Sequence, residues 1–275
     1  YRDGDANPIL TQNARSDFRP YIHPLVAPDG KGELTEYSPD HHKHQTGLYW
    51  GFTRLNGRDY FHHPEATHWR RVKLEALEGN GNDVSWRTIY ELLAEDETTV
   101  LTETQTWTLQ DHGDRYEMNL EWEGEAQTDV TIGEYDYGGL FLRIPWREGI
   151  QGEVVNAARD RGLKAEGRRA MWLDVGMQVE GREDLAHITI FDHSDNGGFP
   201  QPWRVDSQLG IGPVRARLGD WKIAEGANET IKHRLVVYTG DNVDDVSLTE
   251  QWGQFSKQGG TYALWGIAQR EGREA

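Results

Sequence analysis

The sequence contains no cysteine among its 275 residues. This absence excludes disulfides, thiolate zinc sites, iron–sulfur clusters and a cysteine nucleophile. A chain of this length buries enough apolar surface to fold without covalent cross-links. The lack of cysteine is therefore compatible with any compartment.

Positive charge is also scarce, with 29 Lys and Arg residues against 46 Asp and Glu residues and a formal net charge of −17. Such a surface repels polyanions, so we expect no nucleic-acid partner. No apolar run approaches the ~20 residues of a transmembrane helix, so we expect a soluble protein without a membrane partner. The chain starts at Tyr1 rather than at Met, which favours a mature periplasmic or secreted form. Nothing in the pattern indicates an oligomeric state.

Hydrophobic and polar residues alternate in short segments that are separated by Gly, Asn and Asp turns. The clearest case is the run Tyr116, Met118, Leu120 and Trp122, in which every second residue is apolar. A period of two predicts strands with one buried face. The same pattern predicts strands at residues 69–77, 84–93, 98–109, 116–122, 171–179, 185–191 and 231–238, an edge segment at 18–25 and a hairpin turn at Asn56-Gly57.

One helix is predicted at residues 248–257. Ser247 and Glu250 have the spacing of a capping box, and Leu248, Trp252 and Phe255 share one face. We therefore predict one all-β domain over residues 1–275. It is a large antiparallel β-sandwich of the jelly-roll or supersandwich type with one short peripheral helix.

Three of the eleven histidines lie within four residues, at positions 41, 42 and 44. Imidazole titrates near neutrality, so a converging group suits proton transfer, metal ligation or the binding of an anion. If the following strand already starts at His42, its period of two places His42, His44 and Trp50 on one face. Solvated histidines in an acidic loop are the alternative explanation.

Residues 191–205 leave a predicted strand and enter a loop rich in Gly, Pro and Asn. Loops on a rigid sheet commonly carry binding and catalytic residues. The alternation places His193 on the face opposite Ile188 and Ile190, which makes it a candidate for the same site. Turn chemistry alone explains the glycines, but it explains neither His193 nor Trp203.

Trp50 and Trp203 lie beside segments rich in His, Gly and Pro. Aromatic platforms flanked by hydrogen-bonding groups suit sugar rings, whose faces are apolar and whose rims carry hydroxyls. We predict a sugar-binding site that uses His23, Trp50, Asn196 and Trp203.

Several short motifs follow one another along most of the chain: Arg19-Pro20-Tyr21, the segment from His42 to Trp50, Tyr137-Gly138-Gly139-Leu140, Asp192-His193 and residues 200–203. In this order they resemble the bacterial PmoA-like family, a domain of unknown function (DUF6807). The resemblance implies a β-sandwich protein linked to carbohydrate utilisation. The name suggests a methane monooxygenase subunit, but that enzyme consists largely of transmembrane helices, which this sequence lacks.

The chain departs from the pattern of this family at one place. Many members carry His-His-Arg-Gly where this chain has His44-Gln45-Thr46-Gly47. This departure makes Gln45 a poor catalytic candidate and keeps His42 and His44.

Our first hypothesis is an enzyme that acts on uronate-containing oligosaccharides by β-elimination, as a lyase or dehydratase. In this chemistry a base removes the proton α to a carboxylate, a cation stabilises the developing enolate, and an acid assists the leaving oxygen. His42 or His44 is the candidate base, and His193 or Tyr137 is the candidate acid. Arg143 is the candidate clamp for the substrate carboxylate.

Several alternatives remain open. A sugar mutarotase or epimerase needs the same acid and base, whereas a glycoside hydrolase needs a carboxylate pair that the motifs do not show. A non-catalytic sugar-binding module is the alternative from another class. We expect no cofactor, although His42, His44 and His193 are the alternative ligand set for a divalent metal.

Overall fold

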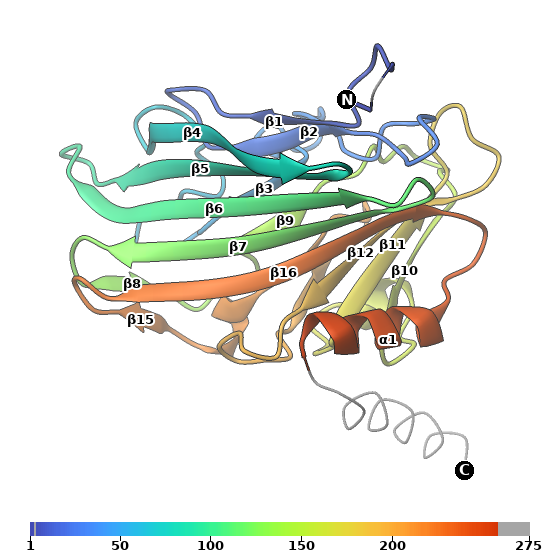
Figure 1. The fold of residues 1–275 in the computed structure, drawn as a ribbon. Helices are drawn as coiled ribbons and strands as arrows, with labels where there is room; N and C mark the ends of the chain where they lie inside the picture. Colours follow the sequence, from blue (N-terminus) through green and yellow to red (C-terminus); the bar gives the residue numbers. More distant parts are fainter. Residues whose placement is uncertain (3, 258–275) are drawn as a thin grey trace.

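The computed structural model describes residues 1, 2 and 4–257, which are built mainly of strands (Figure 1). In chain order the elements are β1 (Leu10–Asn13), β2 (Tyr21–Leu25), β3 (Leu48–Gly51), β4 (Trp69–Asn80), β5 (Asp83–Leu93), β6 (Thr99–Asp111), β7 (Tyr116–Ala126), β8 (Val130–Ile132), β9 (Gly139–Leu142), β10 (Gly152–Asn156), η1 (Gly162–Ala165), β11 (Trp172–Met177), β12 (Ala186–Asp192), β13 (Trp203–Val205), β14 (Ile211–Pro213), η2 (Arg215–Leu218), β15 (Trp221–Ile223), β16 (Asn228–Thr239) and α1 (Asp245–Phe255). No helix in this part of the chain is long and apolar enough to span a membrane.

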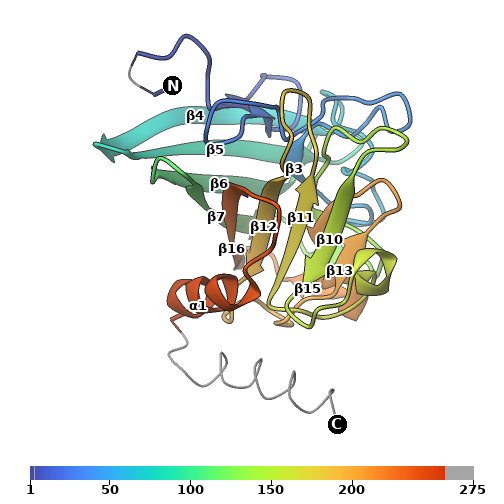
Figure 2. The ribbon, with the colours of Figure 1, turned by 90° about the vertical axis from the view of Figure 1, so that its right-hand side faces the viewer.

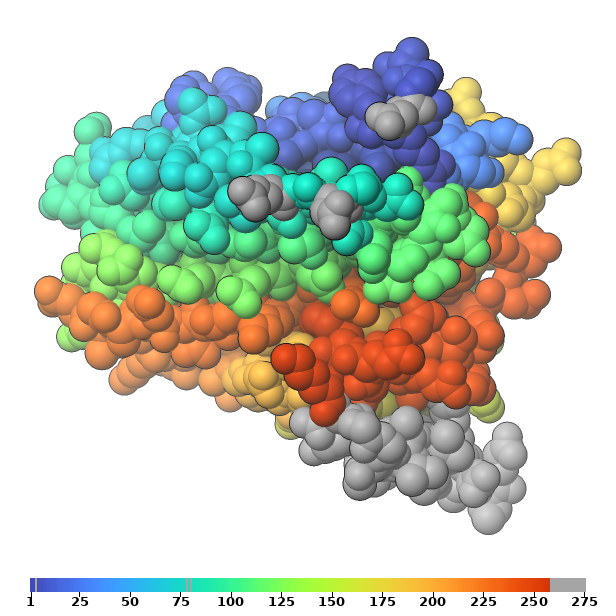
Figure 3. All heavy atoms as spheres, viewed as in Figure 1, coloured from blue at the N-terminus to red at the C-terminus, as the bar shows by residue number. Residues whose placement is uncertain are grey.

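The strands form two large sheets and one small one. Six strands pair in the order β1-β2-β3-β9-β14-β13, eight pair in the order β10-β11-β12-β16-β7-β6-β5-β4, and β15 pairs with β8. Every one of these pairings is antiparallel. Figures 1 and 2 show the two large sheets as separate layers. In Figure 3 the residues of β4, β5, β6, β7 and β16 form neighbouring bands of colour on one face. The predicted all-β sandwich is confirmed.

The core between the two large sheets is rich in tryptophan. Trp50 of β3 stacks on Trp122 of β7, with ring centroids 4.8 Å apart and an interplanar angle of 12°. Tyr116, Met118 and Leu120 of β7 are buried beside Trp122, as the alternation predicts. Burial of large aromatic rings removes much apolar area from water, so this layer holds the two sheets together.

A second apolar cluster lies on the other face of the six-stranded sheet. It consists of Tyr21 of β2, Tyr49 of β3, Phe141 of β9 and Phe61 from the segment between β3 and β4. Tyr49 and Phe141 alternate with neighbours that belong to the main core. Because this face is covered by segments between strands rather than by a second sheet, it is the face on which a site can form.

The predicted strands are present, with small shifts at their ends. The four segments expected between residues 69 and 122 correspond to β4, β5, β6 and β7, and β11 pairs with β12 as predicted. The expectation of an edge strand at residues 18–25 is wrong, because β1 pairs with the outer side of β2. A single domain over residues 1–275 stays a prediction, since residues 3 and 258–275 lie outside the described part.

The helix begins three residues earlier than predicted. The side chain of Asp244 accepts a hydrogen bond from the backbone N–H of Ser247, so Asp244 caps α1 and the capping box at Ser247 does not form. The predicted apolar face is confirmed, because Trp252 is fully buried and Phe255 packs on Phe191. The helix therefore covers the outer face of β11 and β12.

Candidate functional site

A small cavity lies on the outer face of the six-stranded sheet. Its volume is about 110 Å³, and its lining residues are His42, His44, Gln45, Phe61, His62, Tyr137, Phe141, Arg204 and Asp206. These residues come from the segment before β3, the segment between β3 and β4, and the neighbourhoods of β9 and β13. The cavity therefore gathers four parts of the chain that are distant in sequence.

His42 and His44 lie in turns before β3 rather than on an extended strand. Gly47 follows with a φ of +81°, and a Cβ there would lie 2.6 Å from the carbonyl oxygen of Ile22. Only glycine fits this turn, and the turn breaks the alternation that we expected to run from His42 to Trp50. The two imidazoles still meet, with ring centroids 5.7 Å apart.

Arg19 supports His44 from the side of the sheet. Its buried guanidinium donates to the carbonyl oxygens of Phe61 (2.5 Å) and His44, and to Oγ1 of Thr46 at 3.2 Å. It also lies over the Tyr49 ring, 3.7 Å from the centroid. Burial lowers the pKa of Arg19 to about 10, which leaves it charged at neutral pH. This cation fixes the His44 backbone and disfavours a second positive charge on the His44 ring.

Asp59, His62 and Tyr137 form a chain of hydrogen bonds into the cavity. Nδ1 of His62 lies 2.7 Å from Oδ2 of Asp59, and Nε2 of His62 lies 3.3 Å from the Tyr137 hydroxyl. Burial alone would raise the pKa of Asp59, but hydrogen bonds from the His62 ring and from two backbone N–H groups outweigh burial and lower it. Burial raises the pKa of Tyr137 to about 12, so its hydroxyl keeps its proton. A carboxylate at Nδ1 fixes the ring and directs Nε2 to the cavity.

His44 and His62 form the closest pair of imidazoles in the cavity, with ring centroids 4.4 Å apart. Burial, followed by positive charge on His62, Arg19 and His42, lowers the pKa of His44 to about 3. A proton on His62, by contrast, lies against the Asp59 carboxylate. The surroundings therefore keep the His44 ring neutral, while the His62 ring has the Asp59 carboxylate as its partner.

Arg143 does not serve as a clamp for a substrate carboxylate. Its side chain is fully buried, and Nη2 lies 2.6 Å from Oδ2 of Asp206. Nε donates to Oε1 of Gln45, and Nη1 donates to the carbonyl oxygen of Gln208. The guanidinium is thus used to anchor Asp206 and the histidine segment, so the predicted role of Arg143 is wrong. Gln45, which we expected to be a poor catalytic candidate, accepts this hydrogen bond from Arg143 and lines the cavity.

None of the four predicted sugar-binding residues lines the cavity. Trp50 and Trp203 are buried in the core, and Trp203 donates from Nε1 to the carbonyl oxygen of Ala170 at 2.9 Å. Asn196 is buried too and holds Oδ1 of Asp192 at 2.7 Å. These three side chains have structural roles and present no platform to a sugar.

His23 is half-buried on β2. Its Nδ1 lies 3.0 Å from the Thr35 hydroxyl, and its ring stacks on Tyr37. It is not among the residues that line the cavity.

His193 belongs to the opposite side of the sandwich. Its ring meets Phe255 of α1 at 4.9 Å, and its Nδ1 accepts a hydrogen bond from the backbone N–H of Asp195. The alternation correctly places it away from Ile188 and Ile190, but that face is the outer face of the eight-stranded sheet. The expectation that His42, His44 and His193 meet is therefore wrong, and the metal set formed from them is wrong as well.

The sequence analysis missed His62, Asp59, Phe61, Arg204 and Asp206. A signal for the first two was present, because His62 follows an Asn-Gly turn and stands three residues after an aspartate. The hairpin itself is confirmed, since Leu55 and Arg58 exchange two backbone hydrogen bonds. Nothing in the spacing of the chain showed that this segment would fold over the histidines before β3.

A family model matches residues 6–253. The chain belongs to the family of unknown function DUF6807. No curated protein matches the sequence.

Solved structures offer distant likenesses. An α-galactosidase from Lactobacillus brevis matches at 9% identity with a TM-score of 0.41, over 89% of this chain and 41% of that chain. A GH36 α-galactosidase from Geobacillus stearothermophilus in complex with stachyose matches at 8% identity and a TM-score of 0.43, over 88% of this chain and 42% of that chain. A galactose mutarotase related enzyme from Lactobacillus acidophilus matches at 7% identity and a TM-score of 0.38, over 83% and 97% of the two chains. This DUF6807 chain thus spans less than half the length of the galactosidases.

Proposed function

We propose that this DUF6807 protein is an enzyme that interconverts the anomers or epimers of a sugar, with His44 and His62 as its base and acid. The supporting observation is the contact of two imidazoles in one cavity, 4.4 Å apart, of which only His62 is held by a carboxylate. Neighbouring titratable groups whose surroundings favour different protonation states suit the roles of acid and base. With one proton on His62 and none on the basic nitrogen of His44, the pair supplies both an acid and a base.

Mutarotation needs a base at the anomeric hydroxyl and an acid at the ring oxygen. Neutral His44 accepts the hydroxyl proton, while protonated His62 donates its proton to the ring oxygen, directly or through the Tyr137 hydroxyl. The bond between C1 and the ring oxygen breaks, and an open-chain aldehyde forms. Rotation about the C1–C2 bond then turns the other face of the aldehyde toward the hydroxyl that closes the ring. Ring closure by the reverse proton transfers gives the other anomer and returns both imidazoles to their starting states.

The lining of the cavity suits one sugar unit. A volume of about 110 Å³ is small, so a single ring, free or at the end of an oligosaccharide, is the substrate that we propose. Phe61 and Phe141 offer apolar surface for a sugar face, and Gln45 and Asp206 offer polar atoms for hydroxyls. Because Asp206 already neutralises Arg143, we propose a neutral sugar rather than a uronate.

One observation favours β-elimination on a uronate as a second candidate. Arg204 lines the cavity beside the Tyr137 ring, with its guanidinium carbon 5.7 Å from the ring centroid. It also bonds to Glu166 through Nη1 at 2.9 Å. Its remaining donors suit a substrate carboxylate, in which case Tyr137 is the acid for the leaving oxygen.

Freshly dissolved pure anomers of neutral hexoses, pentoses and their uronic acids provide the test. Polarimetry and one-dimensional NMR follow the approach to anomeric equilibrium, while absorbance of unsaturated products follows elimination. We expect accelerated equilibration of at least one neutral sugar and no unsaturated product. Elimination on uronates without any acceleration of anomer exchange would favour the second candidate and overturn the first.

Two variants connect the activity to the cavity. His44→Ala is expected to lower the enzymatic rate by about 10²–10⁴-fold, the usual contribution of a general base. His112→Ala is the matched control, because it removes another histidine, which pairs with Glu117 on the hairpin between β6 and β7. Equal activity of the two variants would contradict the assignment.

A further inference from the structure

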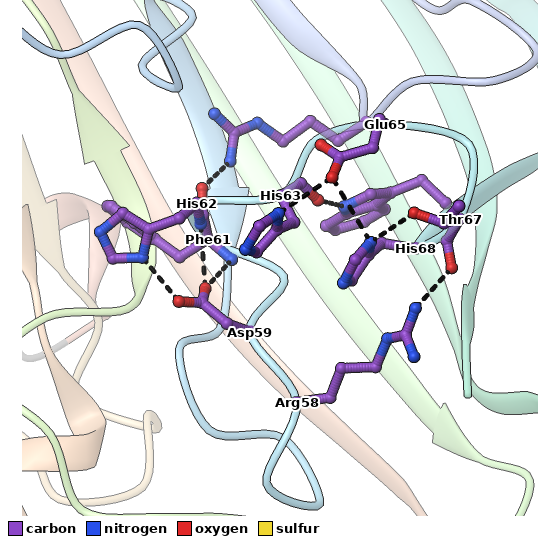
Figure 4. Close-up of polar contacts among 10 residues, drawn as sticks. Arg58, Asp59, Phe61, His62, His63, Glu65, Thr67 and His68 are labelled. Atoms are coloured by element: carbon purple, nitrogen blue, oxygen red, sulfur yellow. Dashed lines mark hydrogen bonds and ion pairs between the residues drawn. The ribbon is translucent and has the colours of Figure 1, made fainter. Parts of the chain in front are cut away.

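A second cluster of titratable side chains lies outside the cavity, at the far end of the segment that carries His62. His63, Glu65 and His68 stand just before β4, and Figure 4 shows both imidazoles turned toward the Glu65 carboxylate. An open hollow of about 580 Å³ adjoins them and includes His63 and His68 in its lining. Solvent and small ions therefore reach this group without passing through the cavity that holds His44.

The three side chains already converge. Nδ1 of His63 lies 2.9 Å from Oε1 of Glu65, and Nδ1 of His68 lies 3.8 Å from the same oxygen. The two rings are stacked almost in parallel, with centroids 4.9 Å apart and an interplanar angle of 11°. One ligand atom from each residue can be chosen so that all three lie within 4.8 Å of one another. In the described part of the chain, this is the group of three His, Asp or Glu residues whose ligand atoms converge this closely.

The backbone around the group is anchored to the sandwich. The Trp69 indole donates to the carbonyl oxygen of His63 at 3.0 Å, and the backbone N–H of Leu93 donates to the carbonyl oxygen of His68 at 3.0 Å. The edge of the Tyr60 ring packs against His68 at 5.5 Å. The backbone of His63 and His68 is thus held by β4, β5 and the core. Only side-chain rotations are needed to bring the ligand atoms onto an ion.

We propose that His63, Glu65 and His68 bind one divalent transition-metal ion of the Zn²⁺ type. Two imidazoles and one carboxylate form a three-ligand site that leaves the fourth tetrahedral position to water. Ligand atoms at ~2.0 Å from Zn²⁺ lie ~3.3 Å apart. The present separations from Oε1 of Glu65, 2.9 Å for His63 and 3.8 Å for His68, lie on either side of this value. Ca²⁺ and Mg²⁺ prefer all-oxygen shells, so the site discriminates against them.

Occupancy of this site would stiffen a segment that also belongs to the cavity. Residues 59–68 form one stretch between β3 and β4, with Asp59 and His62 at one end and the proposed ligands at the other. A bound ion stabilises the folded form because the unfolded chain does not present the three ligands together. The inference does not rest on the proposed sugar chemistry, so either can fail without the other.

Calorimetric titration of tag-free protein, after removal of metal with a chelator, tests the proposal. We expect one Zn²⁺ per chain with a micromolar dissociation constant, and no detectable binding of Mg²⁺ or Ca²⁺. Co²⁺ should give the visible absorption of a tetrahedral site. His63→Ala and Glu65→Gln are each expected to weaken Zn²⁺ binding by at least about 10–100-fold, because losing a ligand should cost no less than losing a residue that supports one.

His112→Ala is again the matched control, because it removes an exposed histidine that pairs with a carboxylate outside the proposed set. His63 is half-exposed, so its replacement is expected to leave the circular dichroism spectrum and the melting temperature without metal unchanged. Wild-type affinity in both His63→Ala and His68→Ala would overturn the proposal. Loss of binding in His44→Ala with retention in His63→Ala would also overturn it, because the ion would then belong to the cavity.

Discussion

Two aspartate–histidine pairs with nearly the same geometry lie on opposite sides of this molecule. Nδ1 of His62 is 2.7 Å from Asp59 on the outer side of the six-stranded sheet. Nδ1 of His187 is 2.8 Å from Asp174 on the outer side of the eight-stranded sheet. The pairs differ in the partner of Nε2, which is the Tyr137 hydroxyl at the cavity in one case and a backbone carbonyl in the other.

The His187 pair has no polar atom left for chemistry. Nε2 of His187 lies 3.0 Å from the carbonyl oxygen of Gly240, and the second oxygen of Asp174 accepts from Thr189 at 2.7 Å and from Tyr238 at 2.9 Å. Asp174, His187 and Thr189 are all buried. A saturated buried network rigidifies the sheet and gives a substrate no access.

The comparison shows that an aspartate–histidine pair by itself does not mark a catalytic site. Both pairs orient an imidazole through a carboxylate at Nδ1. Only the His62 pair has its imidazole in the lining of a cavity, where it stands beside a second imidazole, that of His44. The expected consequence is that loss of the first pair affects turnover, whereas loss of the second affects folding.

The largest effect is expected for His62→Gln. Loss of the proposed acid should lower kcat for anomer exchange by about 10²–10⁴-fold, while urea denaturation should show little change because the side chain is partly exposed. Asp59→Asn keeps the ring but loses its orientation, so a smaller decrease in kcat is expected. Wild-type kcat in both variants would remove the pair from the mechanism.

Asp174→Asn should act in the opposite way. The amide cannot accept from His187, Thr189 and Tyr238 together, so buried donors lose their partner. We expect the free energy of unfolding in urea to fall by about 3 kcal/mol, the usual cost of breaking a buried charged pair. The kcat per folded molecule should stay unchanged. A stable variant with reduced kcat would reverse the comparison.

Most of the fold follows from local sequence patterns. The period of two in β7 is set by apolar side chains that face one core, and pairing of consecutive strands from β4 to β7 requires only short turns. The start of α1 was misplaced because Asp244 and Ser247 both suit a cap, and the structure uses the aspartate. That choice depends on where the helix docks, which the local sequence does not show.

The site was less accessible to sequence reasoning. His42 and His44 were found because they are close together in the chain, and Tyr137 because of its glycine bend. The prediction that His193 joins this site was wrong, because strand alternation gives the face of a sheet but not which sheet of the sandwich the strand joins. Arg143 was wrong because its partner Asp206 stands 63 residues away, where no local pattern announces it.

The two sides of the molecule should also differ in the pH dependence of stability. Burial opposes charge on His187, but Asp174 and the Gly240 carbonyl outweigh burial and raise the pKa of His187 above 6.5. The contribution of His187 to stability is therefore complete below pH 6.5 and is lost as the pH rises through the raised pKa. The pKa of His44 is lowered to about 3, so its contribution is present above pH 6.5 and is lost as the pH falls toward 3.

Urea denaturation at pH 4.5, 6.5 and 8.5 separates the two contributions. We expect His187→Gln to flatten the alkaline side of the stability profile and His44→Ala to flatten the acid side. For His44 the change should be about 1–2 kcal/mol, which allows for solvent screening of a partly exposed ring. Parallel profiles for the wild type and both variants would show that neither ring is linked to folding.

The smallest effect is expected for His193→Ala, which tests the separation of the two sides directly. His193 packs its ring on Phe255 and accepts one hydrogen bond from the Asp195 backbone, all beneath α1 and away from the cavity. Its loss should lower the free energy of unfolding by about 1 kcal/mol, the usual value for a small buried contact and one neutral hydrogen bond. Anomer exchange measured by polarimetry should stay within about 2-fold of the wild-type rate, as expected for a site that a distant substitution does not touch. A loss as large as that of His44→Ala would mean that the two sides are coupled through the sandwich, and the comparison between a reactive and a structural histidine would no longer hold.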